Sequence, residues 1–245
     1  MLRLVDTHAH LDMFPNLDAA LRKARSLGVE AIVAVGSDLK SNVEVLSFSK
    51  SHERFVFPSL GLHPWGVDVN FEEALGFIED EIGRCVAVGE VGLDYWIKKD
   101  SVLQRKVFRM LLEIACRHDK PAVVHSRGAW KDAFELVKEV GLRKAVFHWF
   151  SGPREVLEAI IASGYLISAT PAAEYSLKLR EAVAYAPVDR ILLETDSPVK
   201  YRGTPSEPAD ILKALTAVSK IKGIEESKLA ELTSENAVKF FNLKL

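Results

Sequence analysis

Short apolar runs alternate along the chain with longer stretches in which apolar residues recur every three or four positions. The apolar runs are rich in Val, Ile and Leu, and they predict β-strands at residues 2–7, 30–36, 55–61, 85–92, 121–126, 144–149, 165–170 and 190–195. The stretches between them predict amphipathic helices at residues 17–28, 40–52, 71–83, 102–120, 130–141, 154–164, 176–186 and 209–223. The strands are apolar throughout rather than alternating, which is typical of a parallel sheet covered on both faces.

The repetition of eight strand–helix units predicts a single (β/α)8 barrel domain over residues 1–245. An open doubly wound sheet also alternates strands and helices, but eight units without a GxGxxG turn favour closure. Residues 226–245 predict one further helix, with Thr233 or Ser234 as its N-cap. Four of the other helices are expected to be capped at their C-terminal ends by Gly28, Gly83, Gly141 and Gly164.

Composition and charge narrow the class of protein. The chain is 48% hydrophobic and has a formal net charge of −2, so it lacks the basic surface of proteins that bind nucleic acid over a whole face. A local site for nucleic acid remains compatible with this charge. Cys85 and Cys116 belong to no metal-binding pattern and are expected to be reduced core residues, which favours a cytoplasmic protein. The sequence shows no signal segment and no apolar run of about 20 residues, so we expect no membrane association.

Polar residues interrupt the apolar pattern where most of the expected strands end. Five of the seven histidines lie at such ends, with one glutamate and one aspartate; the residues are His8, His10, His63, Glu90, His125, His148 and Asp196. The C-terminal ends of barrel strands meet at one mouth, where active sites are built. A single strand-end histidine is usually a hydrogen-bonded core residue, but this set together predicts a divalent metal site. The remaining histidines, His52 and His118, end helices and are expected to be structural.

The first strand ends in His-Ala-His. Residues i and i+2 of an extended strand project to the same side, so His8 and His10 are expected to bind one ion together. Asp6 and Asp12 flank the pair, and we expect them to support it by hydrogen bonds or capping rather than to bind metal.

Six stretches of the sequence resemble the TatD family of metal-dependent deoxyribonucleases, a branch of the metallohydrolase barrels. They span residues 6–198 and read DTHAHLD, GLHP, GEVGLDY, VVHSR, HWFSG and ETDSP. The resemblance implies a hydrolase that uses two divalent ions, Mg, Mn or Zn, and that trims DNA from the 3′ end. The implied ligands form two sets that share one carboxylate: His8, His10 and Asp196 for one ion, His125 and His148 for the other, and Glu90 between them.

The same resemblance implies which groups meet the substrate. His63 and Arg127 would lie beside the scissile phosphate, and Ser151 and Gly152 would contact it. An alternative for Arg127 is a salt bridge with Asp94, which could instead orient a histidine ligand.

The sequence departs from the family pattern outside the implied ligand set. Trp149 and Ser126 stand where the family usually or often has Cys, and Ser206 stands where Asn is common. Tyr95, Trp96 and Trp149 are candidates for stacking on unpaired bases, although aromatic residues in such loops are as often ordinary packing.

The expected reaction is in-line attack of a metal-activated water on phosphorus, with Asp196 as the proton acceptor and Arg127 neutralising phosphoryl charge. One rival interpretation is a related barrel hydrolase that acts on an amide, ester or lactone. Such enzymes often bridge two ions through a modified lysine on the fourth strand, where this chain has Glu90. A second rival is a barrel that binds metal only for stability, which would not need an open two-ion mouth.

Overall fold

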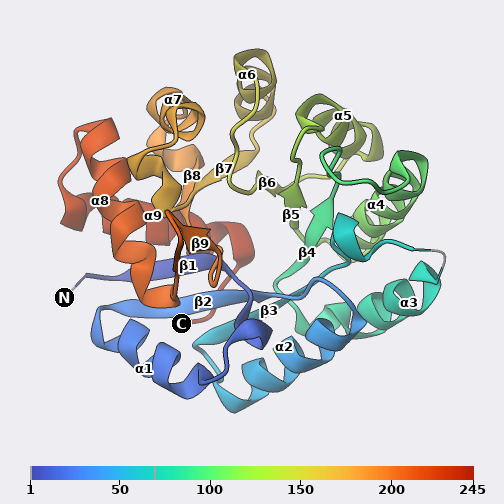
Figure 1. Cartoon of the computed structure of the whole chain (residues 1–245), viewed down its shortest axis with the longest axis horizontal. Helices are drawn as coiled ribbons and strands as arrows, with labels where there is room; N and C mark the ends of the chain where they lie inside the picture. The colour runs from blue at the N-terminus through green and yellow to red at the C-terminus, as the bar shows by residue number, and fades with distance from the viewer. Residues whose placement is uncertain (1, 69) are drawn as a thin grey trace.

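The eight expected strands form one parallel sheet that curls into a barrel surrounded by helices (Figure 1). The structure is a computed structural model, and it describes residues 2–68 and 70–245. Each strand pairs with the next in sequence: β1 (Leu4–Ala9), β2 (Val29–Val35), β3 (Val56–Leu60), β4 (Ala87–Gly92), β5 (Ala122–His125), β6 (Ala145–Phe147), β7 (Leu166–Ala169) and β8 (Ile191–Leu193). Ala9 forms a parallel bridge with Ser197, just beyond β8, which brings the two sheet edges together. The predicted (β/α)8 barrel is confirmed.

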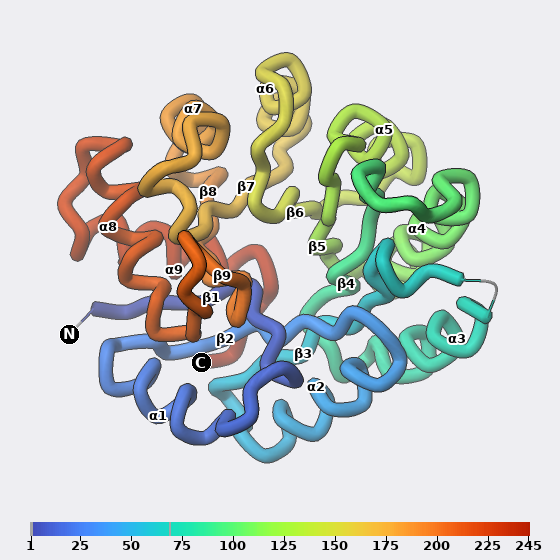
Figure 2. Tube along the Cα trace, in the orientation of Figure 1, coloured from blue at the N-terminus to red at the C-terminus, as the bar shows by residue number. Residues whose placement is uncertain are grey.

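The helices follow the strands in sequence order around the ring, as the continuous change of colour in Figure 2 shows. They are α1 (Leu17–Ser26), α2 (Leu39–Ser51), α3 (Phe71–Glu81), α4 (Ser101–Arg117), α5 (Trp130–Val140), α6 (Arg154–Ala162), α7 (Leu177–Tyr185), α8 (Ile211–Lys222) and α9 (Glu226–Phe241). Short 3-10 turns cover Leu11–Met13, Pro64–Gly66, Ile82–Arg84, Pro171–Glu174, Val188–Arg190 and Pro208–Asp210. A two-stranded hairpin, β9 (Lys200–Tyr201) and β10 (Thr204–Pro205), follows β8.

Three of the four predicted glycine caps adopt the left-handed backbone that favours glycine at helix ends. Gly28, Gly141 and Gly164 have φ values of 94°, 75° and 79°. The prediction for Gly83 was wrong, because α3 ends at Glu81 and the chain continues directly into the 3-10 turn Ile82–Arg84.

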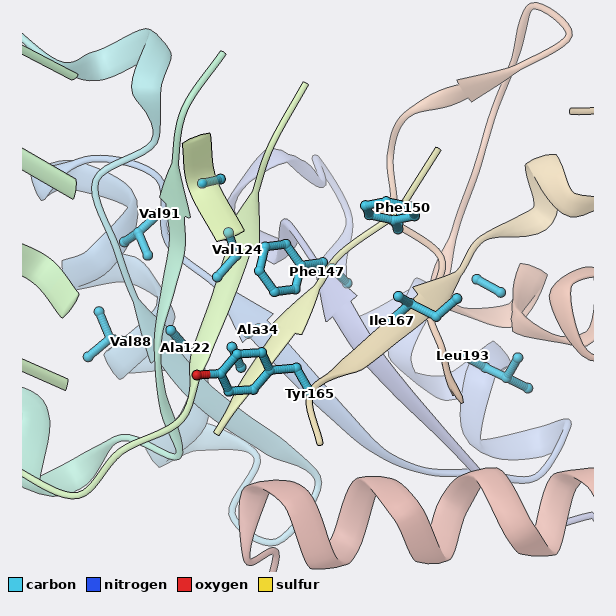
Figure 3. Close-up of a cluster of buried hydrophobic side chains, with 14 of the residues drawn as sticks. Ala34, Val88, Val91, Ala122, Val124, Phe147, Phe150, Tyr165, Ile167 and Leu193 are labelled. Atoms are coloured by element: carbon cyan, nitrogen blue, oxygen red, sulfur yellow. The ribbon is translucent and has the colours of Figure 1, made fainter. Parts of the chain in front are cut away.

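The outer core lies between the strands and the helices. One face of each strand packs there, and Figure 3 shows part of the cluster, including Val88, Val124, Phe147 and Ile167. Tyr165 joins this cluster and donates its hydroxyl to the Leu142 carbonyl at 2.6 Å, so its one polar group is satisfied.

The opposite faces of the strands form an inner core that α9 closes. Alternate residues such as Ala31, Val33 and Val35 cluster with Phe240 and Phe241 at the end of that helix. The C-terminal helix therefore covers the end of the barrel opposite the predicted site.

Two sequence predictions fail in the helices. Thr233 does not begin α9 but lies within it, where its hydroxyl donates to the Leu229 carbonyl at 2.9 Å; Glu225 caps the helix instead. Both cysteines are free, as predicted, but Cys116 is exposed on α4 rather than in the core, whereas Cys85 is buried. None of the helices in the described part of the chain is long and apolar enough to cross a membrane.

Candidate metal centre

The six implied ligands come together at the mouth, where the two oxygens of Glu90 face two separate sets of side chains. Oε2 of Glu90 lies 3.4 Å from Nε2 of His8 and 3.4 Å from Nε2 of His10. Oδ1 of Asp196 lies 3.5 Å from each of the same two nitrogens. The two nitrogens are themselves 3.3 Å apart. These four atoms enclose the first candidate position for an ion.

The second set surrounds the other oxygen of Glu90. Oε1 lies 2.7 Å from Nδ1 of His125 and 2.8 Å from Nε2 of His148, and those two nitrogens are 3.2 Å apart. Nε2 of His63 is 3.3 Å from the same oxygen. A single carboxylate thus separates two groups of nitrogen donors, which is the arrangement of a bridging ligand.

The donor set fits divalent metal ions. Four atoms about 3.4 Å apart define a tetrahedron whose centre lies about 2.1 Å from each corner, which is the usual length of a Zn–N or Zn–O bond. In the first set, five of the six distances between the four donor atoms are between 3.3 and 3.5 Å. Histidine and carboxylate donors also suit Mn and related ions, so the geometry supports metal binding without selecting the element.

Local backbone geometry places these side chains. Asp196 has a φ of 49°, an uncommon value for a residue with a side chain, and its N–H donates to the His8 carbonyl at 2.9 Å. This bond fixes the turn after β8 against β1. Gly92 lets β4 approach β5, since a Cβ at this position would lie 1.9 Å from the His125 carbonyl oxygen.

The electrostatics of the site favour cations. Burial alone would raise the pKa of Glu90, but the charges of His63 and His148 hold it well below its usual value. Burial would lower the pKa of His10, but hydrogen bonds to Asp196 and Glu90 raise it to about 10. The carboxylates therefore stay ionised and favour protonation of His10, His125 and His148, whose pKa values are raised, and a divalent ion would displace those protons.

Asp94 connects this centre to the surface of the mouth. Its fully buried carboxylate lies 3.3 Å from Nε2 of His125 and accepts a hydrogen bond from Nε1 of Trp65 at 2.8 Å. It also forms a salt bridge with Nε of Arg127 at 3.1 Å. Asp94 therefore pairs with Arg127 and contacts the histidine His125 at the same time.

The aromatic candidates have different environments. Trp96 is 67% exposed, and Trp65 is 56% exposed; the Arg127 guanidinium lies 5.4 Å and 5.6 Å from their ring centroids. Tyr95 instead donates its hydroxyl to Asp132 at 2.7 Å, and Trp149 packs against the Tyr201 ring. We refer to Trp65, Asp94, Trp96 and Arg127 as the aromatic–arginine cluster.

Sequence reasoning missed two residues of the centre. Glu194 is buried beside His148, 3.4 Å from its Nδ1, and Trp65 belongs to the aromatic–arginine cluster. Glu194 was detectable, because it stands two residues before Asp196 at the end of the last strand, the same spacing as in His-Ala-His. Trp65 stands two residues after His63, but its hydrogen bond to Asp94 is evident only from the structure.

Other predicted residues lie around the centre rather than in it. Asp6 accepts hydrogen bonds from the Thr195 N–H at 2.9 Å and hydroxyl at 2.6 Å, so it joins β1 to the turn that carries Asp196. Ser151 and Gly152 lie in the loop between β6 and α6, and their contact with a phosphate stays a prediction.

Comparison with known proteins places the chain in a family. A family model described as TatD-related DNase matches residues 5–242. The human deoxyribonuclease TATDN3 is 32% identical over 97% of this chain and 94% of its own length. The uncharacterized metal-dependent hydrolase YcfH of Escherichia coli K12 is 30% identical, over 98% of this chain and 96% of its own. The crystal structure of YJJV, a TatD homologue from E. coli K12, superposes with a TM-score of 0.92 at 27% identity, covering 99% of both chains. The chain belongs to the TatD family of metal-dependent hydrolases.

Proposed function

We propose that this chain is a two-metal phosphodiesterase that hydrolyses DNA and removes nucleotides from the 3′ ends of single strands. The observation that carries the proposal is the placement of Glu90, whose two oxygens face separate sets of histidines. Two bridged ions suit phosphodiester hydrolysis, because they can hold the attacking and the leaving oxygen at once. The deoxyribonuclease name of the human relative supports the same substrate.

The protein side chains have separate tasks in the proposed reaction. When bound, two divalent ions supply a water of lowered pKa and neutralise charge on the phosphate. Asp196 accepts the proton of the attacking water, since its carboxylate faces the same space as His8 and His10. His63 borders the Glu90 carboxylate and donates to a phosphate oxygen, and Arg127 at the mouth neutralises charge on the phosphate.

The aromatic–arginine cluster supports a single-stranded substrate. Two exposed indole rings flank the Arg127 guanidinium, which forms a salt bridge with Asp94, and Asp94 in turn contacts the proposed ligand His125. Unpaired bases stack on such rings, with about 1–3 kcal/mol per base, whereas bases in a duplex are already stacked on one another. Specific contacts at the mouth also suit a protein of net charge −2, which lacks a broad basic surface. The two free cysteines support a cytoplasmic location.

The test is cleavage of a defined oligonucleotide. The chain is stripped of metal and incubated with a 5′-labelled single strand of about 20 nucleotides, with Mg, Mn or Zn or with none. We expect a ladder of products that shorten from the 3′ end only when metal is present, and slower cleavage of a blunt duplex.

Matched variants separate the site from general effects on the protein. His125→Ala and Asp196→Asn should lose nearly all cleavage, whereas His118→Ala, which changes an exposed histidine that ends α4, should retain it. The absence of cleavage with every metal, accompanied by hydrolysis of a lactone or amide, would replace the proposal by the related barrel-hydrolase alternative.

A further inference from the structure

Glu194 is a buried carboxylate beside the metal centre that belongs to neither of the two implied ligand sets. Its side chain is 1% exposed, and it directly follows β8. Oε1 accepts a hydrogen bond from the Trp149 N–H at 2.9 Å and lies 3.4 Å from Nδ1 of His148. The two oxygens of a carboxylate can accept about four hydrogen bonds, so Glu194 has unused capacity.

Two of the proposed ligands, His8 and His148, lie beside this carboxylate, and each has one unsatisfied ring nitrogen. The rings of His8 and His148 stack with centroids 4.4 Å apart and planes 16° apart. Nδ1 of each ring is buried and has no hydrogen-bond partner among the described residues. His8, His148 and Glu194 each offer one possible metal-ligand atom, and these three atoms lie within 4.8 Å of one another.

The other nitrogen of each ring faces the proposed ions. Nε2 of His8 points to the Oε2 side of Glu90, and Nε2 of His148 points to the Oε1 side. A neutral imidazole carries one N–H and one lone pair, so a lone pair at Nε2 requires the proton at Nδ1. A buried N–H needs an acceptor, and Glu194 lies beside both rings, whereas the oxygens of Glu90 face the Nε2 atoms.

We propose that Glu194 is a positioning residue that accepts the Nδ1 protons of His8 and His148 and thereby fixes both rings with Nε2 free to bind metal. Because the two histidines belong to different ligand sets, one carboxylate supports both ion positions. The inference rests on metal binding by the proposed centre, but it does not depend on DNA being the substrate.

A third ion between His8, His148 and Glu194 is the competing interpretation of the same atoms. It would require His8 to bind metal through both ring nitrogens, which means the loss of both of its protons. Support by a carboxylate needs only the ordinary neutral ring, as is common for metal-binding histidines.

Metal binding without nucleic acid tests the proposal. Zn²⁺ is titrated into the metal-free chain by calorimetry, and the bound metal is counted by mass spectrometry. Glu194→Ala should weaken binding at both positions by roughly 10–100-fold, with two ions still bound at saturation. Glu194→Gln, which keeps one acceptor oxygen and the side-chain volume, should show a smaller loss and serves if the alanine variant does not fold.

Ser168→Ala is the matched control, because the Ser168 hydroxyl accepts the same Trp149 N–H at 3.0 Å but belongs to neither ligand set. It should bind Zn²⁺ like the unaltered chain. In ¹⁵N spectra of the Zn²⁺-loaded chain, His8 and His148 should show protonated Nδ1, and these signals should shift in Glu194→Gln.

Three outcomes would overturn the proposal: unchanged Zn²⁺ affinity in both Glu194 variants, an equal loss in Ser168→Ala, or three ions in the unaltered chain and two in the variants. A chain that binds two Zn²⁺ ions in this way but cleaves no DNA would leave the proposal intact and reject only the proposed substrate.

Discussion

Replacement of Asp94 by Asn tests how the metal centre is joined to the mouth. The carboxylate accepts hydrogen bonds from Nε1 of Trp65 at 2.8 Å and from the Trp96 N–H at 3.0 Å. It also lies 3.1 Å from Nε of Arg127 and 3.3 Å from Nε2 of His125. An amide keeps one acceptor oxygen and replaces the other with a donor. In Asp94→Asn, the amide NH₂ would therefore face at least one group that now donates a hydrogen bond to the carboxylate, and that bond would be lost.

The size of the effect follows from burial and charge. A hydrogen bond to a charged group contributes about 1.5–3 kcal/mol, and a neutral one about 0.5–1.5 kcal/mol. The Arg127 side chain is 41% exposed, so solvent screens its salt bridge, which we expect to contribute at most about 1 kcal/mol. The Asp94 carboxylate itself is buried, and its contacts with Trp65, Trp96 and His125 are partly buried, so Asp94→Asn should lower the free energy of unfolding by about 2–3 kcal/mol. It should also weaken metal binding at His125 by roughly tenfold.

Urea unfolding of the metal-free chain and Zn²⁺ titration measure the two effects separately. Asp132→Asn is the control: this half-exposed carboxylate also accepts from a tyrosine and an arginine, at 2.7 Å from Tyr95 and 3.0 Å from Arg105. It should change stability by less than about 1 kcal/mol and leave metal affinity unchanged. If Asp94→Asn matched the unaltered chain in both measurements, the proposed link between Asp94 and the metal centre would be wrong.

Three further predictions concern the barrel and its metal. Gly92→Ala should destabilise the fold by at least about 3 kcal/mol in urea unfolding, since its Cβ would meet the His125 carbonyl at 1.9 Å. Gly76→Ala, in an exposed and open position on α3, should instead stabilise it by about 0.5–1 kcal/mol, and a similar loss in both variants would contradict this reasoning. At pH 8 the native chain should react with a thiol reagent at Cys116 alone, because Cys85 is buried and its pKa is raised to about 12; two reactive thiols would contradict this. Removal of metal by a chelator should lower the melting temperature, since a ligand at 1,000 times its Kd stabilises the folded chain by about 4 kcal/mol. An unchanged melting curve would show that the chain does not bind metal tightly.

The sequence predicts the barrel because its pattern repeats. Eight apolar runs and eight amphipathic stretches leave few topologies, and parallel strands bring their C-terminal ends to one mouth. Residues at those ends, such as His8 and Asp196, are therefore expected to meet although 188 positions separate them in the numbering (196 − 8). Chemistry at strand ends is the part of a barrel site that sequence reasoning predicts best.

The remaining features depend on side-chain directions and loop paths that the pattern does not encode. The sequence does not indicate which oxygen of Glu90 each histidine faces. It also does not indicate that Trp65 donates a hydrogen bond to Asp94. Gly83 was misassigned because α3 continues after Glu81 as a 3-10 turn, which the apolar pattern does not distinguish from a further turn of α-helix. Cys116 was misassigned because a polarizable apolar residue on a helix can face outward without a large cost.

Anomalous diffraction from crystals grown with Zn²⁺ or Mn²⁺ would show directly whether Glu90 bridges two ions. We expect two peaks about 3.5–4 Å apart, with one oxygen of Glu90 bonded to each ion. His8, His10 and Asp196 should bind the first ion, and His125 and His148 the second. A single peak, or two peaks that Glu90 does not connect, would show that the chain does not form a Glu90-bridged two-ion centre.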